Sequence, residues 1–344
     1  MRASVFFFVA LLTRASSVGT LPSGVAAWVY DVSGGEPAMW ASDIAAFNAI
    51  AKKPINTIFS YGGDLEYYAG PDPFKVYFPP ENVAAVAAYK RVANVTSVIT
   101  VVDGRMDGGE PYSPDLTKFT TAQIKEWADN VATLYCSYDD VDGIQLDLEP
   151  FSGKYVTPFL VFLSQLAGDL RAPERNCVSA THPDGRSITT FLSAWGLTDD
   201  VWTALGPNGY ATISGYDLSD APAGTPSTPD FFSHALSSAV AKAAASAAAA
   251  NGSFSVGIPG AASAHEFETF TLANGTVILG SPQIDFARAS VAALNTLATA
   301  PGFLGAALWG FASEMDYPPH SHNAFKPSTP FSSQGEEAFL AAFL

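Results

Sequence analysis

Short apolar runs alternate along the chain with longer stretches in which apolar residues recur at helical spacing. The short runs are rich in β-branched and aromatic residues, and most have Gly, Pro, Asp or Ser at or just after their end. Such runs are typical of parallel strands that are buried on both faces. They predict eight strands, at Val25–Asp31, Ile55–Tyr61, Ser97–Asp103, Val141–Glu149, Asn176–His182, Ala211–Asp217, Ser253–Pro259 and Gly302–Ala312.

The stretches between these runs predict helices, several of which carry suitable end signals. The Ala-rich segment Ala241–Ala250 is predicted as helix because Ala has the highest helix propensity, and Asn251-Gly252 is a suitable stop. The predicted helices are Ser42–Lys52, Pro80–Val92, Thr121–Tyr135, Tyr155–Arg171, Thr198–Leu205, Pro229–Ala250, Pro282–Thr299 and Ser333–Phe343.

Eight strands that alternate with eight helices predict an α/β fold, a closed (β/α)₈ TIM barrel in a single domain. The alternative is an open doubly wound sheet, which binds dinucleotides through a Gly-rich loop after its first strand. Here the first strand leads into residues 30–35, with the sequence YDVSGG, which lacks that fingerprint. In a barrel, functional side chains lie at the C-terminal ends of the strands, so candidate residues are expected there.

The N-terminus has the pattern of a secretory signal peptide. Arg2 supplies the positive charge, Val5–Leu12 is a short apolar run, and small residues follow. A membrane anchor, the alternative, would need about 20 apolar residues, and this run has eight. We therefore expect residues 1–19 to be removed and residues 20–344 to form the barrel. The protein would then be secreted, or enter the lumen of a lysosome-like compartment, without membrane insertion.

The chain is strongly acidic, with 17 Lys and Arg against 33 Asp and Glu and a net charge of −16. Loss of residues 1–19 would remove Arg2 and Arg14 and no acid, which makes the net charge −18. This charge argues against nucleic acid and anionic lipid as partners. The sequence contains no zinc-type cluster and no cofactor fingerprint, so neither a metal nor a cofactor is expected.

The two cysteines are Cys136, just before the fourth predicted strand, and Cys177, at the start of the fifth. Neighbouring strands begin at the same end of a barrel, and an oxidising compartment permits pairing, so a disulfide is predicted. Triplets that begin at Asn94, Asn251 and Asn274 match the acceptor pattern for N-glycosylation, although such triplets also arise by chance.

The fourth predicted strand leads through the sequence DGIQLDLEP at residues 142–150. Because side chains alternate along a strand, Gln145, Asp147 and Glu149 share one face, and the apolar residues between them share the other. The apolar face predicts packing under helices, so the polar face points into the barrel. Carboxylates at i and i+2 lie roughly 6.6 Å apart at Cα and can couple, which raises one pKa and suits a glycosidase acid. The alternative is a structural hydrogen-bond network at the barrel rim.

This segment resembles the D-G-x-D-x-D-x-E signature of glycoside hydrolase family 18, a family of chitinase-like TIM-barrel hydrolases. Asp142, Gly143, Asp147 and Glu149 match the signature, and Gln145 replaces its middle Asp. The match falls on the fourth of eight predicted strands, which is the strand that carries the signature in the family.

Two further strand ends are similar to the same family. The sixth predicted strand ends in SGYD, which keeps the Tyr-Asp of a family motif at Tyr216 and Asp217, and the eighth contains Trp309. The third, which ends at Asp103, departs from the family's S-x-G-G. The resemblance therefore covers roughly residues 24–315.

The resemblance implies a role for each matching residue. Glu149 would be the general acid that protonates the glycosidic oxygen. Asp147 would orient the substrate's own 2-acetamido group, whose carbonyl oxygen attacks the anomeric carbon. Tyr216 would hydrogen-bond that group, and Trp309 would stack under the sugar. This substrate-assisted scheme requires no second enzymic nucleophile.

Other polar residues at strand ends are candidates for substrate binding. Gln145 is expected to lie beside the substrate and to donate an N–H to Asp147. Asp217 and Asp103 could bind sugar hydroxyls, and Asp217 is the stronger candidate because it follows Tyr216.

Aromatic residues end the first two strands, and Trp28 and Tyr61 either line a sugar cleft or belong to the core. His182, at the predicted end of the fifth strand, is interpreted as structural rather than as a ligand.

The resemblance predicts a secreted, monomeric glycoside hydrolase that cleaves β-1,4-linked N-acetylglucosamine glycans by substrate-assisted retaining catalysis, as a chitinase or an endo-N-acetylglucosaminidase. Its partner is an oligosaccharide or polysaccharide. The alternative is a catalytically inactive chitinase-like lectin or inhibitor that binds carbohydrate, which Gln145 favours and the retention of Glu149 disfavours. A third hypothesis is a glycosidase that acts on sugars without an acetamido group.

Overall fold

The computed structural model describes residues 21–29, 41–42, 44–45, 48–49, 53–68, 74–91, 95–109, 112–216, 218, 228–259, 270–271, 277–278 and 283–312. Several predictions fall outside these residues: the signal peptide at 1–19, the helix Ser333–Phe343, Asp217, and the acceptor triplets at Asn94 and Asn274. The third acceptor residue, Asn251, is exposed and ends a helix in the left-handed conformation, with φ 52°.

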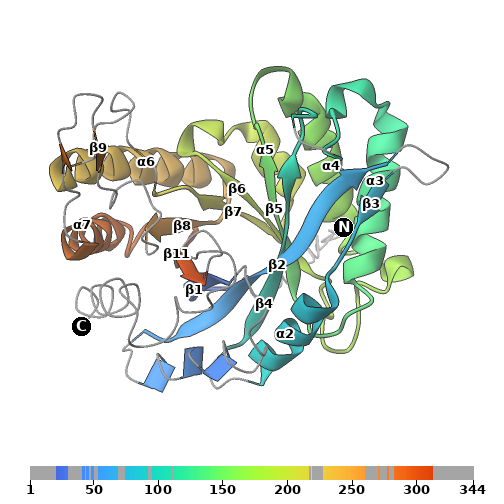
Figure 1. Ribbon diagram of the computed structural model, residues 1–344, viewed down its shortest axis with the longest axis horizontal. Coiled ribbons are helices and arrows are strands. Elements are labelled where there is room, and N and C mark those ends of the chain that lie inside the picture. The colour runs from blue at the N-terminus through green and yellow to red at the C-terminus, as the bar shows by residue number, and fades with distance from the viewer. Residues whose placement is uncertain are drawn as a thin grey trace, which may run out of the picture.

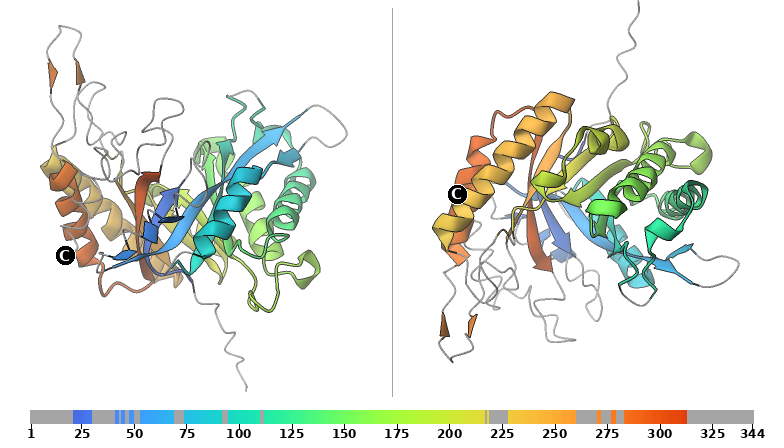
Figure 2. Two further views of the ribbon diagram at one scale, coloured as in Figure 1. Left: turned by 60° about the horizontal axis from the view of Figure 1, so that its bottom comes forward. Right: turned by 90° about the horizontal axis from the view of Figure 1, so that it is seen from above.

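Eight parallel strands form a closed barrel, which confirms the predicted fold class (Figures 1 and 2). The barrel closes because its first strand pairs with both its second and its last strand. Its strands are β1 (Gly24–Val29), β2 (Ile55–Tyr67), β4 (Ser97–Arg105), β5 (Gly143–Glu149), β6 (Ser187–Leu192), β7 (Gly209–Ile213), β8 (Phe254–Pro259) and β11 (Phe303–Ala312). Among the described residues, three short strands lie outside the barrel: β3 (Phe74–Val76), antiparallel to β2, and the pair β9 (Phe270–Thr271) and β10 (Val277–Ile278).

Helices surround the barrel, with α6 and α7 on one side and α3 and α4 on the opposite side (Figures 1 and 2). Their bounds are α2 (Pro80–Lys90), α3 (Thr121–Tyr135), α4 (Val156–Asp169), α5 (Asp199–Leu205), α6 (Pro229–Ala250) and α7 (Gln283–Thr296). The sequence signals act as expected at their ends: Thr120 and Gln123 form a capping box on α3, and Asn251 ends α6. Within the described part of the chain, no helix combines the length and apolar character needed to cross a membrane.

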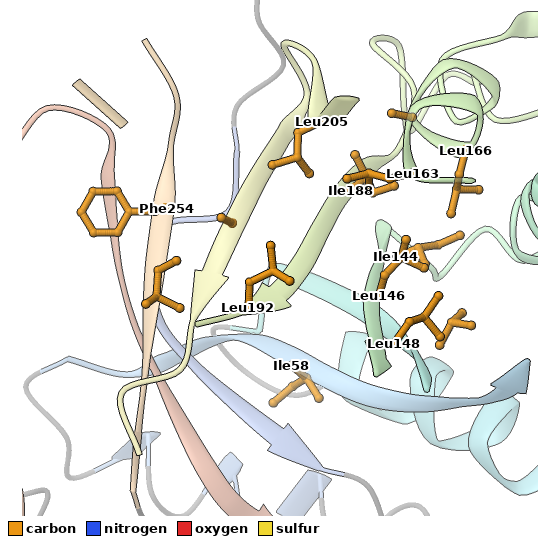
Figure 3. Close-up of a cluster of buried hydrophobic side chains, with 14 of the residues drawn as sticks. Ile58, Ile144, Leu146, Leu148, Leu163, Leu166, Ile188, Leu192, Leu205 and Phe254 are labelled. Atoms are coloured by element: carbon orange, nitrogen blue, oxygen red, sulfur yellow. The ribbon is translucent and has the colours of Figure 1, made fainter. Parts of the chain in front are cut away.

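Strand β5 divides its side chains as the alternation predicted. Ile144, Leu146 and Leu148 point outward into the core between the barrel and the helices, where Leu163 and Leu166 of α4 also lie (Figure 3). Inward apolar side chains of other strands form a second, smaller core inside the barrel, built from Ala26, Trp28, Phe59, Ile99, Val101, Tyr210 and Ala307. The polar face of β5 therefore rises through the barrel interior toward its C-terminal mouth.

The fifth barrel strand is Ser187–Leu192, so the predicted strand Asn176–His182 is wrong. Asn176 adopts the left-handed conformation, with φ 58°, at the end of a 3-10 turn, and an irregular connection follows it. The turn at Pro183-Asp184, which directly follows the predicted strand, comes before the observed one. His182 consequently lies in the connection that enters β6 and not at the strand's C-terminal end.

Strand β2 continues past Tyr61, its predicted end, as far as Tyr67. Its register against β4 shifts between Tyr61 and Gly63, which is the mark of a bulge. Gly63 has φ 113°, and a β-carbon there would collide with the backbone oxygen of Tyr77. The strand runs on beyond the bulge and pairs with β3 outside the barrel (Figure 1).

The predicted disulfide is present, with the Cα atoms of Cys136 and Cys177 4.8 Å apart. Cys136 caps the C-terminus of α3, and Cys177 follows the turn after α4, so the bridge joins two connections that lead into strands rather than two strand starts. Its sequence separation of 41 residues corresponds to about 4 kcal/mol in the chain-entropy account of disulfides.

Asp142 and Gly143, the first two residues of the segment 142–150, are structural and lie at the N-terminal end of β5. The carboxylate of Asp142 accepts the Val98 N–H at 2.7 Å, contacts His182 Nε2 at 3.0 Å and pairs with Lys90. It thereby ties β5 to β4, to α2 and to the connection before β6. Gly143 is required by close packing, because a β-carbon there would lie 2.8 Å from Ile99 Cδ1 and also crowd β6.

We predict that Asp142→Asn lowers the free energy of unfolding by about 1–3 kcal/mol at neutral pH. Burial alone would raise the pKa of Asp142, but the His182, Lys90 and Val98 contacts outweigh it and hold the pKa below its usual range. A lowered folded-state pKa gives stability that is present above the unfolded pKa of about 4 and is lost as pH falls through the folded value. Denaturant midpoints from pH 3 to 8 measure this.

The matched control is Asp140→Asn, because Asp140 is an exposed loop residue two positions earlier. It should change stability by less than about 0.5 kcal/mol at any pH. An Asp142→Asn deficit of the same size at pH 3 and pH 7 would contradict the role assigned to the ionised carboxylate.

Candidate active site

The C-terminal mouth of the barrel contains a cavity of about 640 Å³. Asp147, Glu149, Tyr216 and Trp309, which come from β5, from the end of β7 and from β11, all line it. The structure therefore brings these four predicted residues together in one place. The lining also includes Asp64, Glu66, Asp103, Arg105, Tyr112, Phe191, Ser193 and Ser214.

Exposure increases in steps along the inward face of β5. Gln145 is completely buried, Asp147 is half-buried and Glu149 is exposed. A charged group without full pairing is costly to bury, so the neutral amide occupies the deepest position and the carboxylates lie where water reaches. Asp147 and Glu149 lie at the level where a ligand could meet both.

Gln145 lies below the cavity and makes two buried hydrogen bonds. Its Oε1 accepts the indole N–H of Trp28 at 2.7 Å, and its Nε2 donates to the hydroxyl of Thr212 at 3.2 Å. Thr212 in turn contacts the hydroxyls of Thr189 at 3.0 Å and Ser255 at 3.1 Å. The prediction that Gln145 donates an N–H to Asp147 is wrong: among the described residues its Nε2 donates to Thr212, and its Oε1 accepts from the buried indole of Trp28.

Aromatic rings form the support beneath the cavity. Trp28 is 1% exposed, and its ring lies 5.7 Å from that of Trp309 and 6.4 Å from that of Tyr216, both edge to face. Tyr216 and Trp309 stack in parallel, with centroids 5.2 Å apart and an interplanar angle of 7°. Trp28 thus packs under the cavity, and Tyr61 is half-buried and outside the described lining.

Carboxylates from three neighbouring strands lie at one level of the mouth. Asp64 of β2 is the register partner of Asp103 in β4, and Asp103 is the register partner of Asp147 in β5. One step further along, Arg105 is the register partner of Glu149. Because register couples strands that are distant in sequence, nothing local to the sequence indicates this row.

Among the described residues that line the cavity, Arg105 is the one with a positive charge. Asp107 orients its side chain. Two hydrogen bonds, of 3.1 and 2.7 Å, join its guanidinium to the Asp107 carboxylate. The Arg105 hydrogen bonds, together with the Gly109 N–H, lower the pKa of Asp107. The five lining carboxylates, Asp64, Glu66, Asp103, Asp147 and Glu149, thus face one guanidinium that is already paired. In the described part of the chain, no group of three or more His, Cys, Asp or Glu side chains is arranged to hold a metal ion.

No protein-family model and no curated protein sequence matches the chain. Its fold is similar to that of a chitinase from Chromobacterium violaceum ATCC 12472, with a TM-score of 0.57 and 16% identity over 93% of this chain and 98% of that one. A class V chitinase from Pseudomonas fluorescens Pf-5 gives 0.56 and 13%, over 94% and 100% of the two chains. Human YKL-39, a pseudo-chitinase with retained chitooligosaccharide binding, gives 0.55 and 12%, over 93% and 99%. At these identities the likeness shows a shared fold, and it supports the remote resemblance at that level.

We predict that Gln145→Leu lowers the free energy of unfolding by about 1–3 kcal/mol, because the Trp28 N–H and the Thr212 hydroxyl lose buried partners while the volume is kept. Urea denaturation measures it. The control is Thr189→Val in the same layer. This change removes the hydroxyl that contacts Thr212 but leaves the Trp28 indole paired with Gln145. Thr189→Val should cost less, and equal losses in the two variants would contradict the importance given to the indole–amide bond.

Proposed function

We propose that the protein is a secreted, monomeric glycoside hydrolase that cleaves β-1,4-linked N-acetylglucosamine glycans, with retention of configuration. One observation carries the proposal: Asp147, Glu149, Tyr216 and Trp309 line a single cavity at the C-terminal mouth of the barrel. These are the four residues to which the sequence resemblance assigned the chemistry, and the mouth is where TIM-barrel enzymes bind substrate. Chitinases among the structures of similar fold support the substrate class.

The two carboxylates take different roles in the proposed reaction, those that the sequence resemblance implies. Glu149, the exposed one, donates its proton to the glycosidic oxygen as the bond to the anomeric carbon breaks. The acetamido oxygen of the substrate attacks that carbon and forms a cyclic intermediate. The Glu149 carboxylate then takes a proton from the water that opens the ring, so the enzyme returns to its starting state.

The remaining residues hold the reacting sugar. Asp147, half-buried below Glu149, accepts the acetamido N–H and thereby directs the acetamido oxygen toward the anomeric carbon. The Tyr216 hydroxyl donates to that group. Trp309, half-buried at the cavity and in contact with Trp28, packs against the apolar side of the sugar ring.

A second candidate function is a chitinase-like lectin or inhibitor without activity. Two observations favour it: Gln145 stands where the family signature has an Asp, and one structure of similar fold, human YKL-39, is a pseudo-chitinase. The experiment that separates the candidates is incubation of the protein with chitooligosaccharides and with a high-mannose glycopeptide, followed by mass spectrometry. Cleavage of either supports the hydrolase, and binding without cleavage supports the lectin.

We predict that Glu149→Gln lowers kcat by roughly 10²–10⁴-fold, the usual contribution of general acid catalysis. The amide keeps the shape of the side chain but has no proton to donate, so the dissociation constant for chitooligosaccharide should stay within about threefold. Initial rates and calorimetric titration measure the two effects. Glu126→Gln, an exposed position on α3, is the control and should match the wild type. Wild-type turnover in Glu149→Gln would remove Glu149 from the mechanism.

A further inference from the structure

Asp103 is a carboxylate at the cavity that the proposed reaction does not use. It lies in β4, and its Cα pairs in register with that of Asp147 in β5. Adjacent strands lie about 4.8 Å apart, and both side chains line the same cavity. One oxygen of Asp103 accepts the N–H of Gly104 at 2.6 Å, which limits how the carboxylate can turn.

The neighbours of Asp147 below it on β5 and beside it on β6 differ in kind from Asp103. Gln145, two residues before it, is neutral and bound to Trp28 and Thr212. On the opposite side, β6 contributes Thr189, the register partner of Gln145, and then the aromatic ring of Phe191. Among the described residues, Asp103 is therefore the ionisable group directly across from Asp147 on a neighbouring strand.

The charged and ionisable groups around this pair add negative charge at its own level. Asp64 continues the row on β2, and Glu66 lies beyond it on the same strand. Glu149 lies above Asp147, and Arg105 stands at the level of Glu149 and is paired with Asp107. The hydroxyls of Tyr112 and Tyr216 are the remaining ionisable groups among the described lining residues. Two carboxylates so placed cannot readily both ionise.

We propose that Asp103 is a positioning residue that shares one proton with Asp147 and so fixes the orientation of Asp147 toward the substrate. The proposal rests on the proposed function for its effect on catalysis. In the shared state the protonated carboxyl of Asp103 donates an O–H to the Asp147 carboxylate. The proton stays between the two groups during turnover, so it does not enter the balance of the reaction, which remains with Glu149.

The test combines kinetics with ¹³C NMR titration of protein labelled at the aspartate carboxyl groups. Asp103→Asn should lower kcat by about 10- to 100-fold, since misplacement of an orienting group carries costs of that order, with KM within about threefold. Its acid limb in the pH–rate profile should shift, because Asp147 then lacks the ionisable partner on β4. Asp103→Glu, which keeps the carboxyl, should recover part of the rate, and Asp140→Asn should match the wild type throughout.

The NMR titration decides the sharing of the proton without reference to activity. In the wild type the signals of Asp103 and Asp147 should share a titration step, and Asp103→Asn should remove that step from the Asp147 signal while leaving any step that Asp147 shares with Glu149. Independent single-step titrations in the wild type, or an unchanged kcat and pH profile in Asp103→Asn, overturn the inference and leave the proposed hydrolase in place. A wild type that cleaves no substrate, with the two carboxyl groups still coupled, overturns the proposed function and supports the shared proton.

Discussion

The interior of the barrel can hold polar side chains only where each finds a partner, and the amide of Gln145 meets that requirement at its centre. Its oxygen accepts from Trp28 and its nitrogen donates to Thr212, so both ends of a completely buried side chain are satisfied. The hydrogen bond also fixes the indole of Trp28, against which Trp309 and Tyr216 pack. The arrangement of the rings beneath the cavity therefore depends on one neutral residue, and the carboxylates of β5 lie above it.

Local patterns were sufficient to predict the barrel and the inward face of β5, because alternation along a strand does not depend on distant residues. They failed for the fifth barrel strand, where two runs with β-branched residues flank one Pro-Asp-Gly turn. Contacts between residues that are far apart in the chain decide which run enters the sheet. Cys177 is bonded to Cys136 after α3, whereas Ile188 and its neighbours pair with β5 and β7.

The same distinction separates the site residues that were predicted from those that were missed. Asp147 and Glu149 follow from one strand, and Tyr216 and Trp309 from motifs at two others. Asp64 and Glu66 were missed because Gly62-Gly63 is typical of a strand end, whereas here a bulge lets β2 continue. Asp103 was identified as a strand end, but its place beside Asp147 follows from the register of a closed barrel, which no local pattern encodes.

We propose that the cavity at the barrel mouth recognises an N-acetylglucosamine residue through its acetamido group. A crystal structure of the Glu149→Gln protein with chitotetraose bound tests it most directly. We expect one sugar with its acetamido group against Asp147 and Tyr216, its ring over Trp309 and its glycosidic oxygen within hydrogen-bond distance of residue 149. A sugar chain bound elsewhere, or one whose acetamido group points away from Asp147, would rule out this mode of recognition.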